Sequence, residues 1–586
     1  MEMTGAPKCF EVLHHQKMLT EWFPDAFAIF VSHEWLGRDH PDITGNQTHC
    51  LRMALFNIME ASVKVGFDVL TQSLGFTGQL SAEHADKLKN GYMWMDWMCL
   101  PQNHLENNLD SRMPLFVQRC AIFMILAPKL LKTSTGTMSS YASYERRGWC
   151  RAEIWFKQMC IKPKDVPIIL ITDTEGIKFL RPVSWVHDMV HTGAFTIASD
   201  CERLNRVMES LMSQKLSEFL VNDLTRYRYF SSRFEEIVGR PRRERTLEEF
   251  LRDFKFSEKS LRSSSGMGPL ACAVLTGDVA LLPTLVEKRA SLCCAAPNMM
   301  DVDIIPGMTP LALAAKSRDP ESIIELVKLR ANVNETDILG TCVLGHAGSP
   351  QVVQVLLDLQ ADVNQRKGPF GLSALSSCIL RALQPEGLKL MLEAKASVNV
   401  GAGMYSFSPL TTATLFREMP RNVETCHLLL DARADINYRE GFYVVLNRLA
   451  RGLCCLQRHP STLLEGIASC NGGTPLYIAA WFGNPEMVNL LLEAKADPEI
   501  RNNRGESYLD ALNFTHSGCG ATSMTWQIQN PDRWAVHEPK EDAKDTVESV
   551  PQTKDACNGE QSQAGEGTRQ NIQRKEGQSV NLDGSL

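Results

Sequence analysis

A single carboxylate stands in an aromatic stretch of the sequence, RRGWCRAEIW, at residues 146–155. Glu153 follows Trp149 by one helical turn, so the two side chains share a face if this stretch is a helix. Two interpretations are open. Glu153 either lies on a solvated face, paired with neighbouring arginines such as Arg151, or it faces a pocket and contacts a substrate.

Four apolar runs around this stretch have the composition of strands. Each is short and rich in β-branched or aromatic residues, as strands buried on both faces are. Helical periodicity occurs before and between them, most clearly at 46–66. This alternation predicts a parallel α/β sheet. The runs are AFAIFVSHEW at 26–35, YMWMDWMCLPQ at 92–102, RCAIFMILAP at 119–128 and DVPIILITD at 165–173.

Polar side chains stand at or near the ends of two of these runs. Ser32 and His33 follow the apolar part of the first run, and Asp96 lies near the end of the second. Ligands of parallel α/β sheets bind beyond the carboxyl ends of the strands. We therefore expect Ser32, His33, Asp96 and the loop after Leu126 to converge there and to form a substrate pocket.

The same segments resemble a known family. FVSHEW, YMWMDWMCLPQ, AIFMILAPKL and SSYASYERRGWCRAEI appear in the order found in Toll/interleukin receptor (TIR) domains. YMWMDWMCLPQ also resembles the signature of fungal heterokaryon-incompatibility (HET) domains, a related group. The resemblance covers about residues 25–175 and implies a flavodoxin-like sheet in a domain that spans 25–225.

This resemblance implies two alternative activities. Some TIR domains cleave the nicotinamide–ribose bond of NAD, and their catalytic glutamate, in W-x-x-x-E, matches Glu153. A carboxylate there would stabilise the positive charge that develops on the ribose. Trp149 would wall the pocket and Ser32 would line the loop opposite it. Other TIR domains are adaptors that self-associate, so a homo-oligomer without enzyme activity or any required cofactor is the alternative.

Residues 266–512 contain an internal repeat. Its clearest copy, GGTPLYIAAWFGNPEMVNLLLEAKADPEIRN, occupies 472–502, with Thr474 as the predicted N-cap and Pro475 at the first helical position. Other copies end at 334, 364, 399 and 437, so they are 30, 35 and 38 residues apart. The ankyrin period is 33 residues. These segments resemble about six ankyrin repeats and predict binding of partner proteins.

The repeats depart from the ankyrin pattern in two ways. Glycine usually precedes the A-D-x-N turn, and other residues replace it here. If this backbone position is left-handed, each replacement costs roughly 1 kcal/mol against glycine; otherwise the helices end differently. Residues 441–470 are either a degenerate repeat or an inserted loop. The replacing residues are Arg289, Arg330, Gln360, Lys395, Arg433 and Lys495.

The remaining segments are predicted from composition. Residues 226–265 mix both charge signs and predict a linker with one helix that starts at Thr246 as N-cap. Residues 519–586 contain almost no large apolar side chains, so we expect them to be disordered. No apolar run approaches the roughly 20 residues that cross a bilayer, and no secretory signal begins the chain, which predicts a cytoplasmic protein.

Several function classes are not favoured. The net charge of −7 over 586 residues gives no basic surface for nucleic acid. The 18 cysteines lack the C-x-x-C spacing of zinc sites, so we expect mostly small buried thiols. HDMVH at 187–191 lacks the glutamate of zinc proteases, so no metal is predicted. The sequence thus favours an intracellular signalling or scaffold protein, with an NAD-cleaving enzyme as the alternative.

Overall fold

The computed structural model describes residues 5–68, 71–72, 75–101, 109–160, 165–182, 185–262, 266–366, 371–401, 407–415, 422–441 and 468–512. All of them lie in the unit that spans Met1–Arg533. The tail predicted to be disordered, 519–586, lies outside the described residues. Among the helices of the described segments, none combines the length and the hydropathy that a membrane span requires.

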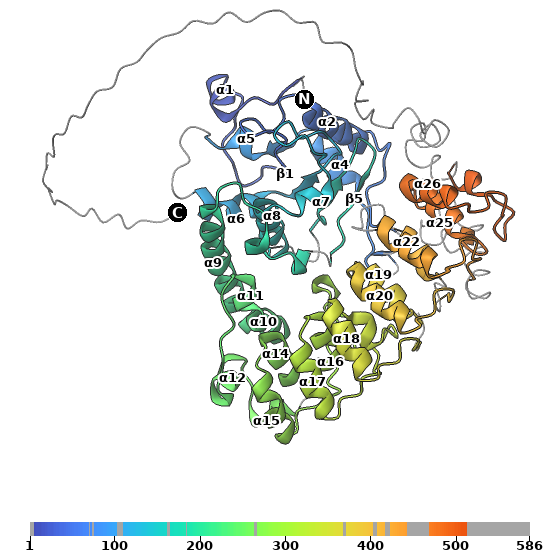
Figure 1. Ribbon diagram of the computed structural model, residues 1–586. Coiled ribbons are helices and arrows are strands. Elements are labelled where there is room, and N and C mark those ends of the chain that lie inside the picture. The colour runs from blue at the N-terminus through green and yellow to red at the C-terminus, as the bar shows by residue number, and fades with distance from the viewer. Residues whose placement is uncertain are drawn as a thin grey trace, which may run out of the picture. The chain divides into compact units, whose positions relative to one another are not determined.

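A five-stranded sheet forms in the N-terminal part, with strand order β2-β1-β3-β4-β5 (Figure 1). β1 is parallel to both β2 and β3, β3 is parallel to β4, and β5 runs antiparallel to β4. The four predicted runs correspond to β1–β4. The strands are β1 (Ala28–His33), β2 (Tyr92–Trp94), β3 (Ile122–Leu126), β4 (Ile169–Ile171) and β5 (Ile177–Phe179).

The antiparallel fifth strand has a local cause. Only residues 172–176 connect β4 to β5, whereas a parallel crossover needs about a dozen residues or more. Within this turn, Asp173 Oδ1 accepts hydrogen bonds from the backbone amides of Glu175, at 2.9 Å, and Gly176, at 2.5 Å. The prediction of a parallel sheet is therefore confirmed for four strands, but the sheet as a whole is mixed. The flavodoxin-like assignment stays a prediction.

Both faces of the sheet are covered by helices. On β1, Phe30 packs into one core with residues of α6 (Leu109–Arg119) and α8 (Gly148–Gln158), whereas Ile29 and Val31 pack into a second core with α2 (Asn46–Met59). This explains why the central runs are apolar without alternation. Shorter helices complete this part: α1 (Phe10–His15), α4 (Ala82–Leu88), α5 (Asp96–Cys99), α7 (Tyr141–Tyr144), η1 (Trp185–His187) and η2 (Val190–Thr192).

The connecting segment contains more helix than predicted. Thr246 caps α12 through a capping box with Glu249, as predicted. The prediction of one helix in 226–265 is nevertheless wrong, because aromatic residues such as Phe230 and Phe250 are buried and order the segments around them. The helices of this segment are α10 (Leu224–Ser232), α11 (Phe234–Ile237), α12 (Leu247–Asp253) and α13 (Glu258–Leu261), and α9 (Ser199–Asn222) precedes it.

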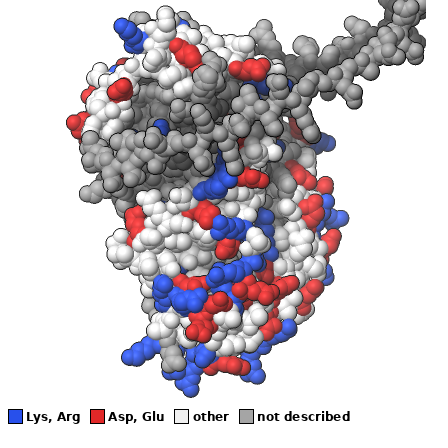
Figure 2. All heavy atoms as spheres, turned by 90° about the vertical axis from the view of Figure 1, so that its left-hand side faces the viewer, with Lys and Arg blue, Asp and Glu red and all other residues white. Residues whose placement is uncertain are grey.

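Charges of both signs intermingle on the face that includes the connecting helices (Figure 2). The printed ion pairs account for part of this mixing, since Arg240 contacts Glu209 at 2.5 Å and Arg243 contacts Asp253. Nucleic-acid binding proteins gather basic residues on one face. This face has no such single-sign patch in the part of the chain that the structure describes.

Helix pairs follow in the repeat region, as the ankyrin resemblance predicted (Figure 1). In the third pair the first helix is reduced to the 3-10 helix η5. The pairs are α14 (Pro269–Thr276) and α15 (Leu282–Glu287), α16 (Pro310–Lys316) and α17 (Pro320–Lys328), η5 (Val343–His346) and α18 (Pro350–Asp358), α19 (Ala374–Leu380) and α20 (Pro385–Glu393), α21 (Pro409–Thr414) and α22 (Asn422–Asp431), and α25 (Pro475–Trp481) and α26 (Pro485–Glu493). The 3-10 helices η3 (Val279–Leu281) and η4 (Met300–Val302) lie between them.

The T-P-L motif starts these helices in the predicted way. Thr474 Oγ1 accepts a hydrogen bond from the amide of Tyr477 at 3.3 Å, and Pro475 is the first helical residue. Thr309 and Pro310 do the same for α16. The cap satisfies a backbone amide that the helix itself leaves without a partner.

Asparagine side chains join the turns of successive repeats. Each asparagine of an A-D-x-N or related turn accepts, through Oδ1, a hydrogen bond from a backbone amide in the next turn. These bonds run from Asp362 to Asn334, Ser397 to Asn364, Asp435 to Asn399 and Asp497 to Asn437, with lengths of 2.8, 2.8, 2.7 and 2.9 Å. The last bond spans 60 residues, the others 28 to 36. The turn at Asn437 therefore contacts the turn at Asp497 directly. Whether 441–470 is a repeat or an insertion stays a prediction, because residues 442–467 lie outside the described residues.

The glycine-replacing residues all have left-handed backbone. Their φ angles lie between 62° and 74°, so the helices end as in ankyrin repeats despite the side chains. A Cβ in this region is strained, because it approaches the following carbonyl oxygen. The residues are Arg289, Arg330, Gln360, Lys395, Arg433 and Lys495.

Replacing one of these residues by glycine is expected to stabilise the array. Lys395→Gly relieves the strain at φ 64° but adds freedom to the unfolded chain, so we expect a net gain of about 0.5–1 kcal/mol. Lys389→Gly is the matched control, because Lys389 is an exposed residue inside α20, where glycine costs about 1 kcal/mol. Denaturant unfolding measures both. A shift of the same sign in the two variants contradicts this account.

Candidate functional site

The carboxyl ends of β1 and β2 bring together an ionisable pair. His33 Nε2 lies 2.8 Å from Asp96 Oδ1, and its Nδ1 lies 3.0 Å from the side-chain oxygen of Gln47. Trp35 Nε1 donates to the other oxygen of Asp96 at 2.9 Å. Burial lowers the pKa of His33, but the Asp96 carboxylate outweighs it and the net pKa is raised. The pKa of Asp96 is lowered, because His33 overcomes the effect of burial.

Glu153 lies on α8 and points into the same edge of the sheet. It is 8% exposed, and its Oε2 hydrogen-bonds to Ser32 Oγ, which is itself 2.5 Å from the Tyr144 hydroxyl. Burial raises the pKa of Glu153 from its ordinary 4.5 to about 8, although the Ser32 hydrogen bond acts in the opposite direction. Glu153 is therefore mostly protonated at neutral pH, when it can donate a proton.

The solvated interpretation of Glu153 is wrong. The side chain of Arg151 turns to the Glu145 carbonyl, at 2.5 Å, and to the Met189 carbonyl, at 2.9 Å, and does not pair with Glu153. Glu153 is buried because the residues around it on α8, including Ala152 and Ile154, pack against the sheet.

Four of the five predicted site residues meet. Ser32, His33 and Glu153 are buried, and Asp96, whose side chain is 31% exposed, joins them through His33. The four are linked by the hydrogen bonds above and by the effect of the Asp96 and His33 charges on the pKa of Glu153. Trp149 does not join it, because its indole N–H donates to Asp200 Oδ2 on α9 at 2.8 Å. Their roles as catalytic and pocket residues stay predictions.

Sequence reasoning missed a third carboxylate at this edge, beside Asp96 and Glu153. Glu34 is 4% exposed and contacts Lys132 Nζ, at 2.7 Å, and Ser143 Oγ, at 2.5 Å. Its position directly after Ser32 and His33 is the signal that could have included it. Tyr144 lies in the quoted SSYASYERRGW segment, but its contact with Ser32 depends on tertiary packing and has no local signal.

The histidines of the HDMVH segment do not share a ligand. His187 Nε2 contacts Asp303 Oδ2 at 2.9 Å, and His191 lies at η2. In the part of the chain that the structure describes, no three His, Cys, Asp or Glu side chains are arranged to hold a metal ion. The described cysteines are free thiols, most of them buried.

Comparisons with known proteins bear on the array. Residues 463–510, which include α25 and α26, match the family model described as ankyrin repeats (many copies). The crystal structure of the human ASB11 ankyrin repeat domain is similar at 21% sequence identity, over 42% of this chain and 91% of that chain, with a TM-score of 0.31. No curated protein matches the chain. The ankyrin match indicates a protein-binding role, and the TIR resemblance stays a prediction.

Proposed function

We propose that this chain is a signalling or scaffold protein that binds a partner protein through its ankyrin repeats. The observation that carries the proposal is the row of asparagine hydrogen bonds, which holds successive turns in register along the array. Stacked repeats form extended surfaces suited to partner binding. The cytoplasm is the compartment that the sequence favours for this role.

The accessible part of the array is its second helices and turns. The first helices are buried along most of their length; every residue of α21 and α25, for example, is buried. Among the described residues of the array, three large apolar side chains are exposed: Ile324 on α17, Ile338 in the turn bridged by Thr336 and Cys342, and Leu509 near residue 512. Ile324 lies on the second helix pair, and Ile338 lies between the second and third pairs. Exposed apolar residues at a rigid position are suited to anchoring a partner.

Aspartate at these positions is expected to reduce partner recovery. Ile324→Asp and Ile338→Asp place a charge where an apolar contact is buried on binding, which typically costs 2 kcal/mol or more at an anchor. Val221→Asp is the matched control, because Val221 is 83% exposed on α9, outside the array. Affinity capture with quantitative mass spectrometry compares the three full-length chains. Equal recovery of every partner by all three rejects these anchors and the surface that contains them.

We further propose that the N-terminal sheet is a TIR-like domain that self-associates or acts as an effector. The strand order β2-β1-β3-β4-β5 supports this, because doubly wound flavodoxin-like sheets have the order 2-1-3-4-5 and bind ligands at the carboxyl ends of their strands. The antiparallel β5 lies at the edge farthest from Ser32 and leaves that end of β1 unaffected.

An NAD-cleaving enzyme is the second candidate. The specific observation in its favour is the meeting of Glu153, Ser32 and the His33–Asp96 pair at the edge where such sheets bind ligands. A glutamate with a raised pKa beside a second ionisable group is the arrangement used in acid–base cleavage of glycosidic bonds. Because Ser32 and Glu153 are buried, whereas Asp96 is partly exposed, NAD would approach from the side of Asp96 and displace the cover of the other two. Release of nicotinamide is the reaction that tests this candidate.

A further inference from the structure

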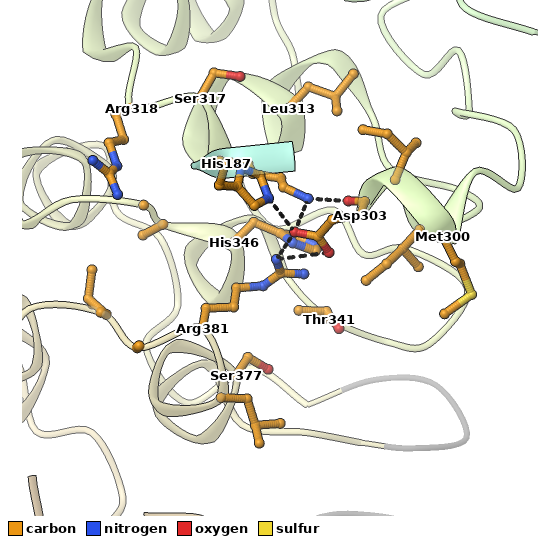
Figure 3. A pocket seen from close by; sticks show the side chains of 18 of the residues that line it. His187, Met300, Asp303, Leu313, Ser317, Arg318, Thr341, His346, Ser377 and Arg381 are labelled. Carbon is orange, nitrogen blue, oxygen red and sulfur yellow. Dashed lines mark hydrogen bonds and ion pairs between the residues drawn. The ribbon is translucent and has the colours of Figure 1, made fainter. Parts of the chain in front are cut away.

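A cavity of about 560 Å³ lies apart from the Glu153 cluster. Its lining includes His187 of η1, Tyr229 of α10 and side chains of α16 and α19 in the array (Figure 3). Its size is typical of sites for small ligands. None of Ser32, His33, Asp96, Trp149 or Glu153 belongs to the lining.

The charged side chains of this lining are unbalanced. Only two carboxylates, Asp303 and Glu236, are among the lining residues. Six cationic side chains line the cavity, and one of them, Arg181, pairs with Asp68 outside the lining at 3.2 Å. The other five still outnumber the two carboxylates, so the cavity has a positive field at neutral pH. The cationic lining residues are Arg181, Arg233, Arg242, Lys316, Arg318 and Arg381.

Two of the cationic side chains, Lys316 and Arg381, contact the carboxylate of Asp303 (Figure 3). Asp303 lies 3.1 Å from Arg381 and 2.9 Å from the neutral ring of His187. Burial lowers the pKa of Lys316 to about 7, and the positive charge of Arg381 acts in the same direction despite the attraction of Asp303. One carboxylate therefore compensates the two cations incompletely.

Two further arginines of the lining, Arg242 and Arg318, form no ion pair with a described residue, although the charge of Arg242 helps to lower the pKa of Glu236. Arg233 forms a bidentate ion pair with Glu236, at 2.8 and 3.1 Å, so the second carboxylate of the lining is already paired. Arg242 and Arg318 are exposed, and no hydrogen bond or ion pair joins either side chain to another described residue. Their guanidinium groups are available to a ligand.

We propose that this cavity binds a small organic phosphate. Guanidinium and ammonium groups bind phosphate oxygens through charge-assisted hydrogen bonds, and a doubly charged phosphate suits several cations better than a single carboxylate does. The remaining wall is apolar and would receive the organic part of the ligand. Its apolar residues include Leu313, Leu380, Leu383 and Phe407.

The test is calorimetric titration of the full-length chain with ATP, inorganic pyrophosphate and adenosine. ATP and pyrophosphate are expected to bind saturably, and adenosine, which lacks phosphate, at least about tenfold more weakly than ATP. Arg318→Gln is expected to weaken both phosphates by about tenfold, as the loss of one charge-assisted contact does. Arg242→Gln tests the other arginine in the same way.

The matched control is Arg330→Gln. Arg330 is exposed and has left-handed backbone at the end of a helix, as Arg318 has, but it does not line the cavity. Thermal melts establish that each variant is folded. The proposal is overturned if neither ATP nor pyrophosphate binds at millimolar concentrations, or if Arg318→Gln with Arg242→Gln binds them as tightly as Arg330→Gln does. Either result leaves partner binding by the array unaffected.

Discussion

Glu153→Gln is expected to reduce the loss of stability that the chain undergoes as pH rises from about 4.5 to 8. The pKa of Glu153 is raised by burial from 4.5 to about 8, so the folded state retains a proton that the unfolded chain releases. Between about pH 4.5 and 8 the unfolded state therefore binds fewer protons, and stability falls as pH rises. Each unit of pKa shift corresponds to about 1.4 kcal/mol. The loss by pH 9 is thus several kcal/mol in the wild-type chain.

Glutamine retains the shape and the contact with Ser32 but cannot ionise. Melting temperatures from pH 6 to 9 should therefore fall less steeply for Glu153→Gln than for the wild-type chain. Glu440→Gln is the matched control, because burial also raises the pKa of Glu440, to about 7, in the array. The stabilising effect of Glu440→Gln should reach its full size at about pH 7, below the pH at which that of Glu153→Gln does. Parallel curves for wild type and Glu153→Gln mean that Glu153 is not protonated in the folded chain.

Nicotinamide release from NAD, if the N-terminal sheet is an NAD-cleaving domain, is expected to fall by about 100-fold or more in Glu153→Gln, because acid–base groups contribute roughly that much. The amide keeps the hydrogen bond to Ser32 but cannot give up or take a proton. Chromatography of NAD mixtures with concentrated full-length chain measures the rate. The full chain is needed because Trp185 and Tyr229 belong to the same buried core as residues of the array.

Glu440→Gln is again the control for this experiment. It removes a buried carboxyl group that accepts the Ser408 amide at 2.9 Å and belongs to the repeat region, not to the N-terminal sheet. Release that persists in Glu153→Gln excludes Glu153 as the acid–base group. A folded wild-type chain that releases no nicotinamide at any concentration rejects the enzyme and leaves the self-association role.

The meeting of Ser32 and Asp96 could be predicted from the sequence because it follows from topology, whereas the place of Glu153 beside them follows only from the resemblance of its W-x-x-x-E motif. Apolar runs mark the strands, and parallel strands place their carboxyl ends on one edge. The T-P-L caps were predictable for a related reason, since Thr474 bonds to an amide only three residues away. In both cases a local pattern determines which atoms meet.

Other features have no local pattern. β5 has only three residues, too few to display a strand period, and its direction is set by the length of the preceding turn. Trp149 turns to Asp200 because α9 packs against α8, which the spacing to Glu153 does not encode. The Asp303 cluster joins side chains from positions 187, 303, 316 and 381, so it exists only in the folded chain.

The bond between the Asp497 amide and Asn437 makes the array tolerant of changes in chain length. The turns at Asn437 and Asp497 meet across this join although 60 residues separate them in the sequence. Doubling the length of a flexible connection costs only about 0.6 kcal/mol in closure entropy. Insertions and deletions at this point can therefore accumulate during evolution while the units on either side keep their register.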